Sequence, residues 1–200
     1  MSDNQLADPR ELMRQALLAA SGIVAGLKPD VMSGPTPCTE FDVATLTNHL
    51  TGAVARSASI AAGVPVEGML EVDATEPEDG WAAAFEAARE SALAAWVDDS
   101  LLGKEFTLPW ATVPGAGIVT MYAMETALHS WDLAVATGQD DLLDDAVSEA
   151  LLPTAHQFLP PDHRGGDVPF AAVVEIPADA RIADQLAAFT GRRRPEWTAE

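Results

Sequence analysis

Apolar residues recur every three or four positions through most of this chain, and proline and glycine divide the pattern into blocks. This period is typical of helices that bury one face. It predicts four long helices, at about residues 9–27, 42–63, 81–97 and 118–138, and a fifth at about 141–159. The stretch KEFTLPWATVPGAG contains two prolines and is expected to run extended between the third and fourth helices.

The pattern changes after residue 160. FAAVVEIP predicts a short strand, and ADARIADQLAAFTG predicts a helix that ends at Gly191. We therefore expect a mainly α protein. Residues 1–160 would form a helical bundle, and residues 161–200 a small α+β extension made of a strand and a helix.

Two polar residues interrupt the apolar stripe of the fourth predicted helix. In MYAMETALHSWDLAVATG, Glu125 and His129 are four residues apart and therefore project from the same face. A carboxylate on a buried face needs a charged partner or a metal. His49 interrupts the stripe of the second predicted helix in the same way. Two imidazoles and one carboxylate facing inward from two packed helices predict a three-ligand metal site.

A purely structural explanation exists for each of these residues. A single histidine on an apolar face is more often a satisfied core residue than a ligand. An inward Glu125 could also be matched by an arginine or a histidine in a bundle without metal. The combination of three inward polar groups on two helices favours the metal site, because a buried carboxylate without a partner costs several kcal/mol.

Two further residues are candidates for catalytic roles. Asp132, three residues after His129, could accept a hydrogen bond from a ligand imidazole and fix its tautomer, or it could make only a structural helix contact. Arg56 lies seven residues after His49 on roughly the same face. It could hold a substrate carboxylate through two hydrogen bonds, or it could form a surface ion pair.

The formal net charge of -20 argues against nucleic acid as a partner, because phosphate binding needs a basic surface. Arg192, Arg193 and Arg194 form the densest basic run and are expected at a solvated helix end rather than in an anion clamp. No apolar run approaches the roughly 20 residues that cross a bilayer, so no membrane partner is expected.

The compartment is predicted from the first residues and from the cysteine content. The start MSDNQLADPRELMRQ lacks the basic and apolar regions of a signal peptide. The single cysteine, Cys38, excludes an intramolecular disulfide and fits a reducing compartment. A cytoplasmic location is therefore expected, with Cys38 as a small buried side chain rather than a reactive thiol.

Three stretches together resemble a known family. TPCTEFDVATLTNHL, ETALHSWDLAVATGQ and AFTGRRRP, in this order, look like stretches of actinobacterial metal-binding proteins related to mycothiol-dependent maleylpyruvate isomerase, within the wider DinB-like group. The resemblance implies a DinB-like four-helix bundle that holds a divalent metal, commonly zinc, between its helices. Matched position by position, it assigns the ligands to His49, Glu125 and His129. Phe41 stands where the family commonly has tryptophan, and the tail is shorter than the C-terminal domain of the isomerase branch.

The expected chemistry follows from the ligand set and from the resemblance. Zinc with two imidazoles and one carboxylate keeps an open position, as catalytic sites do; iron and nickel fit the same ligand types. The resemblance adds mycothiol, whose thiolate would attack an electrophilic substrate in an isomerisation or S-transfer. We expect a metal-dependent enzyme, monomeric or homodimeric, that acts on a small-molecule thiol and an electrophile. The alternative is a non-catalytic metal-binding or small-ligand-binding bundle.

Overall fold

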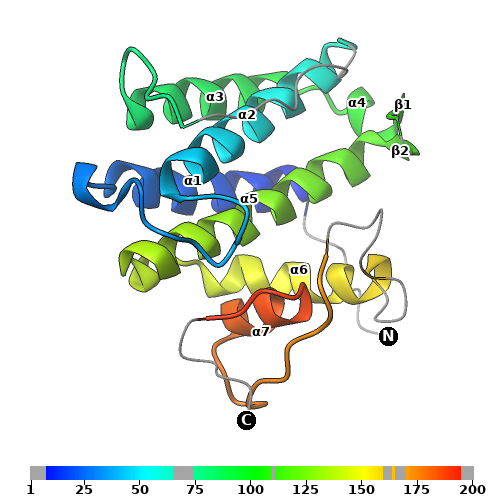
Figure 1. Ribbon diagram of the computed structural model, residues 1–200. Coiled ribbons are helices and arrows are strands. Elements are labelled where there is room, and N and C mark those ends of the chain that lie inside the picture. Colours follow the sequence, from blue (N-terminus) through cyan, green and yellow to red (C-terminus); the bar gives the residue numbers. More distant parts are fainter. Residues whose placement is uncertain (1–7, 65–73, 110, 160–163, 165–169, 195–200) are drawn as a thin grey trace.

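Four helices close into a bundle in the computed structural model, which describes residues 8–64, 74–109, 111–159, 164 and 170–194 (Figure 1). The bundle helices are α1 (Pro9–Ala25), α2 (Val43–Ala61), α3 (Trp81–Ala95) and α5 (Gly115–Thr137). Helices α1 and α2 each pack against both α3 and α5, so the contacts form a ring around one apolar core. The predicted mainly α class and four-helix bundle are confirmed.

Local capping explains where the bundle helices begin and end. Helix α2 begins after Asp42, whose carboxylate accepts a hydrogen bond from the Thr45 amide at 2.8 Å. Such a cap satisfies one of the amides that the first helical turn leaves without a partner. Helix α5 ends at Gly138, which adopts φ +67°, a left-handed conformation that glycine adopts at little cost. These signals agree with the predicted boundaries to within a few residues.

Helix α5 lies at the centre of the molecule and is buried on most of its faces. It contacts α1 and α2 within the bundle, and α6 and α7 on its other side. Its first residue, Gly115, is packed so closely against α4 (Ser100–Gly103) that an added Cβ would lie 2.0 Å from the carbonyl oxygen of Leu101. A side chain at position 115 would therefore push these two helices apart.

The two-proline stretch before α5 forms a small hairpin. Strands β1 (Glu105–Thr107) and β2 (Thr112–Pro114) pair antiparallel, with Phe106 opposite Val113. Phe106 is buried against Trp96 at a ring-centroid distance of 5.6 Å. The extended conformation expected for this stretch is confirmed at its two strands, whereas its last three residues, 115–117, already belong to α5. The sheet of the described residues lies here rather than in the tail.

The C-terminal part packs beneath α5 (Figure 1). It contains α6 (Asp145–Phe158), which is capped by Asp144, and α7 (Ile182–Phe189). Short 3-10 turns, η1 (Pro29–Val31) and η2 (Asp140–Leu142), follow α1 and α5. Part of the predicted extension, residues 161–163, 165–169 and 195–200, lies outside the described residues, as does residue 160 at the end of the predicted bundle.

The prediction of a strand over FAAVVEIP is wrong. Residues 170–177 are described and form no strand. Val174 alone among them is buried, and its amide bonds to the carbonyl of Ala188 in α7 at 2.9 Å. A strand needs a neighbouring strand to complete its hydrogen bonds, whereas this segment lies against a helix. The apolar run in the sequence therefore reflects packing on α7 rather than sheet formation.

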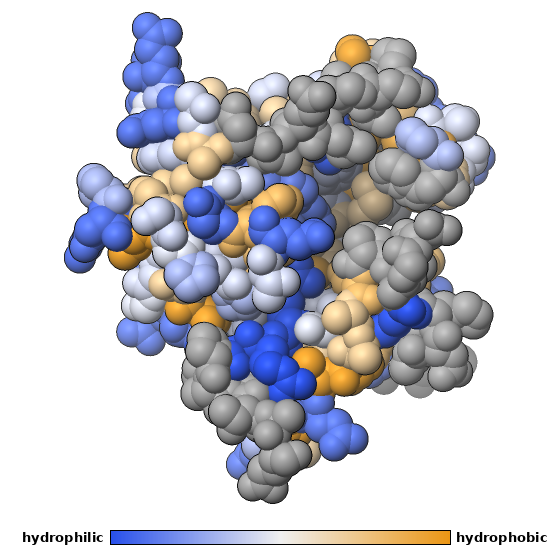
Figure 2. All heavy atoms as spheres, viewed as in Figure 1, coloured by the Kyte–Doolittle hydropathy of each residue, from blue (hydrophilic) through white to orange (hydrophobic). Residues whose placement is uncertain are grey.

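No described helix has the length and apolar character needed to span a bilayer. On the face shown in Figure 2, hydrophilic and apolar side chains are interspersed rather than segregated.

Candidate metal centre

The three predicted ligands meet between α2 and α5. The Nε2 atom of His49 lies 3.0 Å from Oε1 of Glu125, and the Nε2 atom of His129 lies 3.3 Å from the same oxygen. The two imidazole rings are edge to face, with centroids 4.8 Å apart. The helical spacing of Glu125 and His129 aims both side chains at α2, and the packing of α2 against α5 brings His49 to them.

The separations between these atoms fit a bound divalent ion. Zinc bonds to imidazole nitrogen and carboxylate oxygen are about 2.0–2.1 Å long, so neighbouring ligand atoms of a tetrahedral site stand roughly 3.3–3.4 Å apart. One ligand atom from each of the three residues lies within 4.8 Å of the other two. An ion therefore needs only small side-chain adjustments to bind all three.

One side of the cluster is open. The side chain of His129 is 7% exposed and that of His49 is 19% exposed, whereas that of Glu125 is 32% exposed. Three protein ligands with access from one side are typical of catalytic sites, which keep a position for water or substrate. The arrangement can accept a small molecule from the Glu125 side.

Asp132 contacts the imidazole nitrogen of His129 that faces away from Glu125. The Nδ1 atom of His129 lies 3.0 Å from Oδ2 of Asp132, whose side chain is fully buried. Nδ1 donates this bond when Asp132 is ionised, which leaves Nε2 to face Glu125 and His49. The structure therefore brings Asp132 into the contact with a candidate ligand that its spacing predicted.

The charges of the cluster stabilise one another. Partial burial would raise the pKa of Glu125, but the two imidazoles outweigh it and lower that pKa well below its usual range. Burial would likewise lower the pKa of His129, but the Glu125 and Asp132 carboxylates raise it to about 9. The cluster thus favours positive charge beside Glu125, which a proton or a metal ion can supply.

A second group of candidate ligands shares His129. Cys38, His129 and Asp132 each offer an atom within 4.8 Å of the other two. The Arg192 guanidinium already lies 3.1 Å from Asp132, and its charge opposes a second cation there. Burial, followed by the charge of Asp132, raises the pKa of the Cys38 thiol to about 11. This agrees with the expectation of an unreactive thiol, although Cys38 is half-buried rather than fully buried.

Arg56 lies beside Tyr122, one turn before Glu125 on α5. Burial raises the pKa of Tyr122, and the neighbouring Arg56 guanidinium, which donates to its hydroxyl, opposes that rise. Arg56 thus contacts the face of α5 that also carries Glu125. Tyr122 is buried and was not singled out from the sequence, where it resembles any other aromatic residue of an apolar stripe.

The arginine run after α7 is not solvated in the way that the sequence predicted. Arg192 and Arg194 are not at a solvated helix end: each side chain is 13% exposed, and they pair with Asp132 and with Asp140 and Asp184. The turn at Gly191 directs them inward. Its φ is +89°, and an added Cβ would lie 2.7 Å from the carbonyl oxygen of Ala171. In the sequence, a glycine directly before the arginines indicates a turn after the helix, but it does not identify the acidic residues that the arginines contact.

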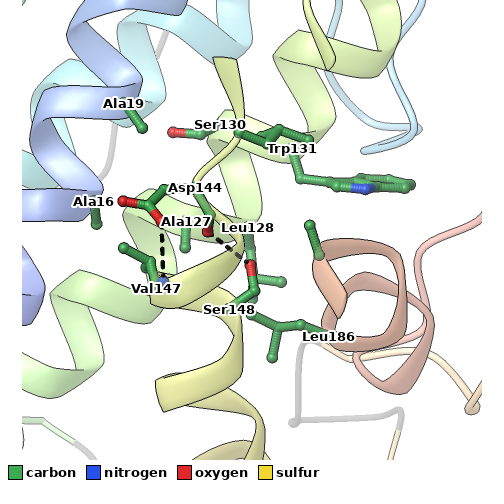
Figure 3. A pocket seen from close by; sticks show the side chains of 12 residues that line it. Ala16, Ala19, Ala127, Leu128, Ser130, Trp131, Asp144, Val147, Ser148 and Leu186 are labelled. Carbon is green, nitrogen blue, oxygen red and sulfur yellow. Dashed lines mark hydrogen bonds between the residues drawn. The ribbon is translucent and has the colours of Figure 1, made fainter. Parts of the chain in front are cut away.

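Two hollows in the described part of the chain lie away from the three ligands. A cavity of about 20 Å³ lies on the opposite side of α5, between Ser130, Trp131 and Ser148 (Figure 3). It has room for one water molecule, and the buried Ser130 hydroxyl has no partner among the described residues. A groove of about 410 Å³ runs between α6, residues 173–178 and α7.

Comparison with known proteins identifies the family. The family model described as "Mycothiol maleylpyruvate isomerase N-terminal domain" matches residues 13–134, which include all three candidate ligands. Two relatives from Mycobacterium tuberculosis, from strains CDC 1551 / Oshkosh and ATCC 25618 / H37Rv, are each 34% identical over 185 residues, covering 92% of this chain and 98% of the relative. Both are named as uncharacterized proteins. No solved structure matches the chain significantly. The chain belongs to the mycothiol maleylpyruvate isomerase N-terminal domain family.

Proposed function

We propose that this protein is a divalent-metal-dependent enzyme that uses a small-molecule thiol, as an isomerase or an S-transferase. The observation that carries the proposal is the meeting of His49, Glu125 and His129 at separations of 3.0 and 3.3 Å between α2 and α5. The family supplies the thiol, mycothiol, because its description names that compound. The substrate would be an electrophilic small molecule.

Zinc is the metal that we propose, since two imidazoles and one carboxylate suit it; iron and nickel remain alternatives. Zinc at this site would deprotonate a bound thiol and so generate the nucleophile. The three ligand side chains supply the donor atoms, and the open side at Glu125 admits the thiol and its substrate.

Two other residues have proposed roles. Asp132 keeps His129 in the tautomer whose Nε2 faces the ion, through the contact of 3.0 Å at Nδ1. Arg56 would hold a carboxylate of the substrate, because its planar guanidinium can donate two parallel hydrogen bonds to such a group. Arg56 contacts Tyr122, which lies three residues before Glu125 on α5, and this supports the proposed role. Arg56 would contact the substrate itself, whereas Asp132 would act through His129.

The partners that we propose are small molecules. The net charge of -20 opposes binding to nucleic acid. The protein is expected to act in the cytoplasm, as a monomer or a homodimer.

Elemental analysis of untagged protein purified without chelator tests the metal part of the proposal. We expect one equivalent of zinc, iron or nickel per chain, and loss of that metal in Glu125→Gln. Glu40→Gln, which removes an exposed carboxylate in the loop before α2, is the matched control and should keep the metal. Protein that is metal-free and does not take up added zinc would contradict the proposal.

A turnover assay with mycothiol and a panel of electrophiles tests the enzymatic part. A non-catalytic thiol-binding protein is the second candidate function, and one observation favours it. The two carboxylates in contact with the candidate histidine ligands, Glu125 and Asp132, are both engaged by those histidines, which leaves neither available as a general base. Tight mycothiol binding by the zinc-loaded protein without any turnover would support this second candidate.

A further inference from the structure

The C-terminal segment reaches the candidate metal centre through one side chain. Arg192 donates from Nε to Oδ2 of Asp132 at 3.1 Å, and the same oxygen lies 3.0 Å from Nδ1 of His129. Arg192 follows α7 and lies outside residues 13–134, the region that matches the family model. A chain of three side chains therefore connects the tail to a candidate ligand.

The burial of Asp132 makes the arginine important. The Asp132 side chain is fully buried, and its Oδ1 atom has no hydrogen-bond partner among the described residues. A buried carboxylate is costly unless an opposite charge lies beside it. A histidine that coordinates a metal is neutral, so in the metal-bound protein Arg192 is the charged side chain in direct contact with Asp132.

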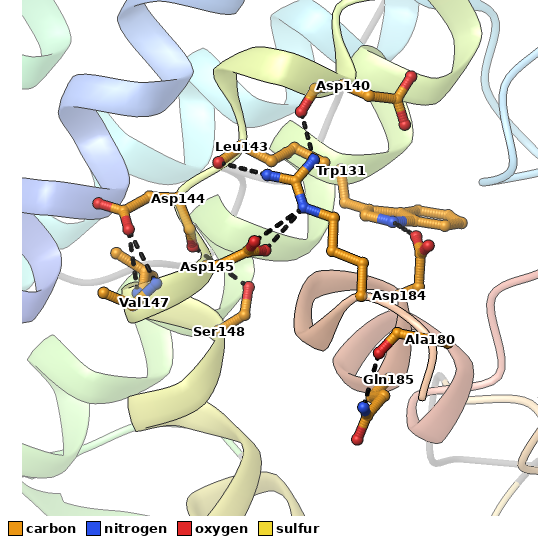
Figure 4. Close-up of polar contacts among 12 residues, drawn as sticks. Trp131, Asp140, Leu143, Asp144, Asp145, Val147, Ser148, Ala180, Asp184 and Gln185 are labelled. Carbon is orange, nitrogen blue, oxygen red and sulfur yellow. Dashed lines mark hydrogen bonds and ion pairs between the residues drawn. The ribbon is translucent and has the colours of Figure 1, made fainter. Parts of the chain in front are cut away.

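A second set of contacts docks the same segment without touching the ligands. Asp184 of α7 accepts a hydrogen bond from the indole nitrogen of Trp131 at 2.8 Å (Figure 4). Arg194 pairs with Asp184 at 2.8 Å and also with Asp140. Trp131 and Asp132 are adjacent on α5, so the tail contacts neighbouring residues at two points, through Arg192 and through Asp184, which Arg194 pairs with. Arg194 therefore provides a control for Arg192.

We propose that Arg192 is a positioning residue that docks the C-terminal segment onto Asp132 and thereby couples metal binding to the docking of residues 181–194. Arg192 holds Asp132, and Asp132 holds the His129 ring in the orientation that presents Nε2 to the ion. By thermodynamic reciprocity, a bound ion stabilises the docked tail as much as the docked tail stabilises the bound ion. This inference rests on the metal site of the proposed function.

Zinc affinity, measured on the full chain by competition with a chromophoric chelator, tests the coupling. Loss of an outer partner of a metal-bound histidine typically weakens metal affinity by roughly 10–100-fold. Because Arg192 acts one step further away, we expect Arg192→Gln to weaken zinc binding by about 10-fold, at the lower end of that range. Arg194→Gln should lose thermal stability but keep its zinc affinity within about twofold, since Asp140 and Asp184, the carboxylates that it pairs with, are not candidate ligands. Arg192→Lys, which retains the charge, should recover part of the affinity.

A second measurement follows the tail itself. Hydrogen exchange of residues 181–194 should slow when zinc is added to the wild type and to Arg194→Gln, and this response should shrink in Arg192→Gln. Circular dichroism checks that each variant is folded, and Arg192→Lys is the milder variant if Arg192→Gln is not. Equal zinc affinity in the wild type and Arg192→Gln would overturn the inference while leaving the metal site standing. Equal losses in Arg192→Gln and Arg194→Gln would also overturn it, because they would indicate general destabilisation. A wild type that binds no zinc would overturn both proposals.

Discussion

His49 and Glu125 are 76 residues apart in the chain, yet their side chains meet at 3.0 Å between Nε2 and Oε1. The contact joins α2 to α5 and involves one residue from each helix. Without metal, it places an acceptor carboxylate against an imidazole. With metal, both groups would contact the same ion, and the link between the helices would be stronger. The following predictions concern this link and the groups around it.

Chelation is expected to lower the stability of the metal-loaded protein. An ion that binds the folded chain and not the unfolded chain stabilises it by an amount that grows with ligand concentration, about 2.7 kcal/mol at 100 times Kd. Thermal unfolding monitored by circular dichroism, with and without chelator, measures the difference. The Glu125→Gln variant serves as the control, and its midpoint should not respond to chelator. An unchanged midpoint in the wild type would favour a bundle held by its side-chain contacts alone.

Replacing Asp132 by asparagine is expected to weaken metal binding by roughly 10–100-fold, because the His129 ring loses its charged partner. The variant should also lose about 3 kcal/mol of unfolding free energy, since Arg192 is left without its carboxylate in a largely buried position. Chelator competition and urea unfolding measure the two effects. Asp184→Asn is the matched control: it removes a carboxylate that pairs with Arg194 and Trp131, so it should cost stability but not metal affinity.

The Cys38 thiol is expected to resist alkylation at neutral pH. Burial raises its pKa from 9.0 to about 11, so the protonated form persists well above neutrality. The thiolate fraction is then roughly 100-fold smaller than that of an ordinary cysteine. Iodoacetamide labelling followed by mass spectrometry, across a pH series, should show a rate that keeps rising as pH approaches about 11. Rapid labelling of the folded protein at neutral pH would contradict the prediction, and urea-unfolded protein provides the reference rate.

Removing the cap of α2 is expected to destabilise the protein modestly. Asp42→Ala deletes the acceptor for the Thr45 amide, a change that typically costs about 1 kcal/mol. Asp42→Ser, which keeps an acceptor at the cap, should recover most of that loss. Urea unfolding of the three proteins measures the effect. Equal stability of the alanine and serine variants would mean that the cap contributes little to a helix already held by packing.

Arg56→Gln is expected to raise KM for a substrate that carries a carboxylate, by roughly 10-fold, and to leave kcat nearly unchanged, as loss of a charged hydrogen bond used only for binding would. An uncharged ester of the same substrate is the control and should be unaffected by the substitution. Arg89→Gln, which removes an arginine paired with Glu86 on α3, should change KM for neither the acid nor the ester. Equal effects on acid and ester would argue against carboxylate recognition by Arg56.

The helical core and the three candidate ligands were predictable because both depend on local periodicity. Glu125 and His129 share a face by their spacing alone, and His49 stands out as a polar residue within an apolar stripe. The pairing of Arg192 with Asp132 was not predictable in this way. It joins residues 60 positions apart through the turn at Gly191, and only the packing of α7 on α5 decides which acid the arginine reaches.

The strand expected at residues 170–177 shows the limit of pattern reading in the opposite direction. A short run of apolar residues indicates a segment that packs against the rest of the fold, but it does not specify whether the neighbour is a strand or a helix. Val174 packs against α7, and the segment makes a backbone bond to Ala188 instead of a ladder. The division of the chain near residue 160 stays a prediction, and the contacts of Arg192 and Asp184 with α5 show that the two parts share an interface.

The enclosure of α5 has a kinetic consequence for any ion that binds there. Two of the three candidate ligands lie on α5, which contacts neighbouring helices on several sides, so little ordering would be required when an ion binds. The same enclosure restricts exit, because His129 cannot swing away without disturbing Asp132 and the tail beyond it. We therefore expect the bound metal to dissociate slowly. The movement of His49 and Glu125 on the open side would limit its dissociation rate.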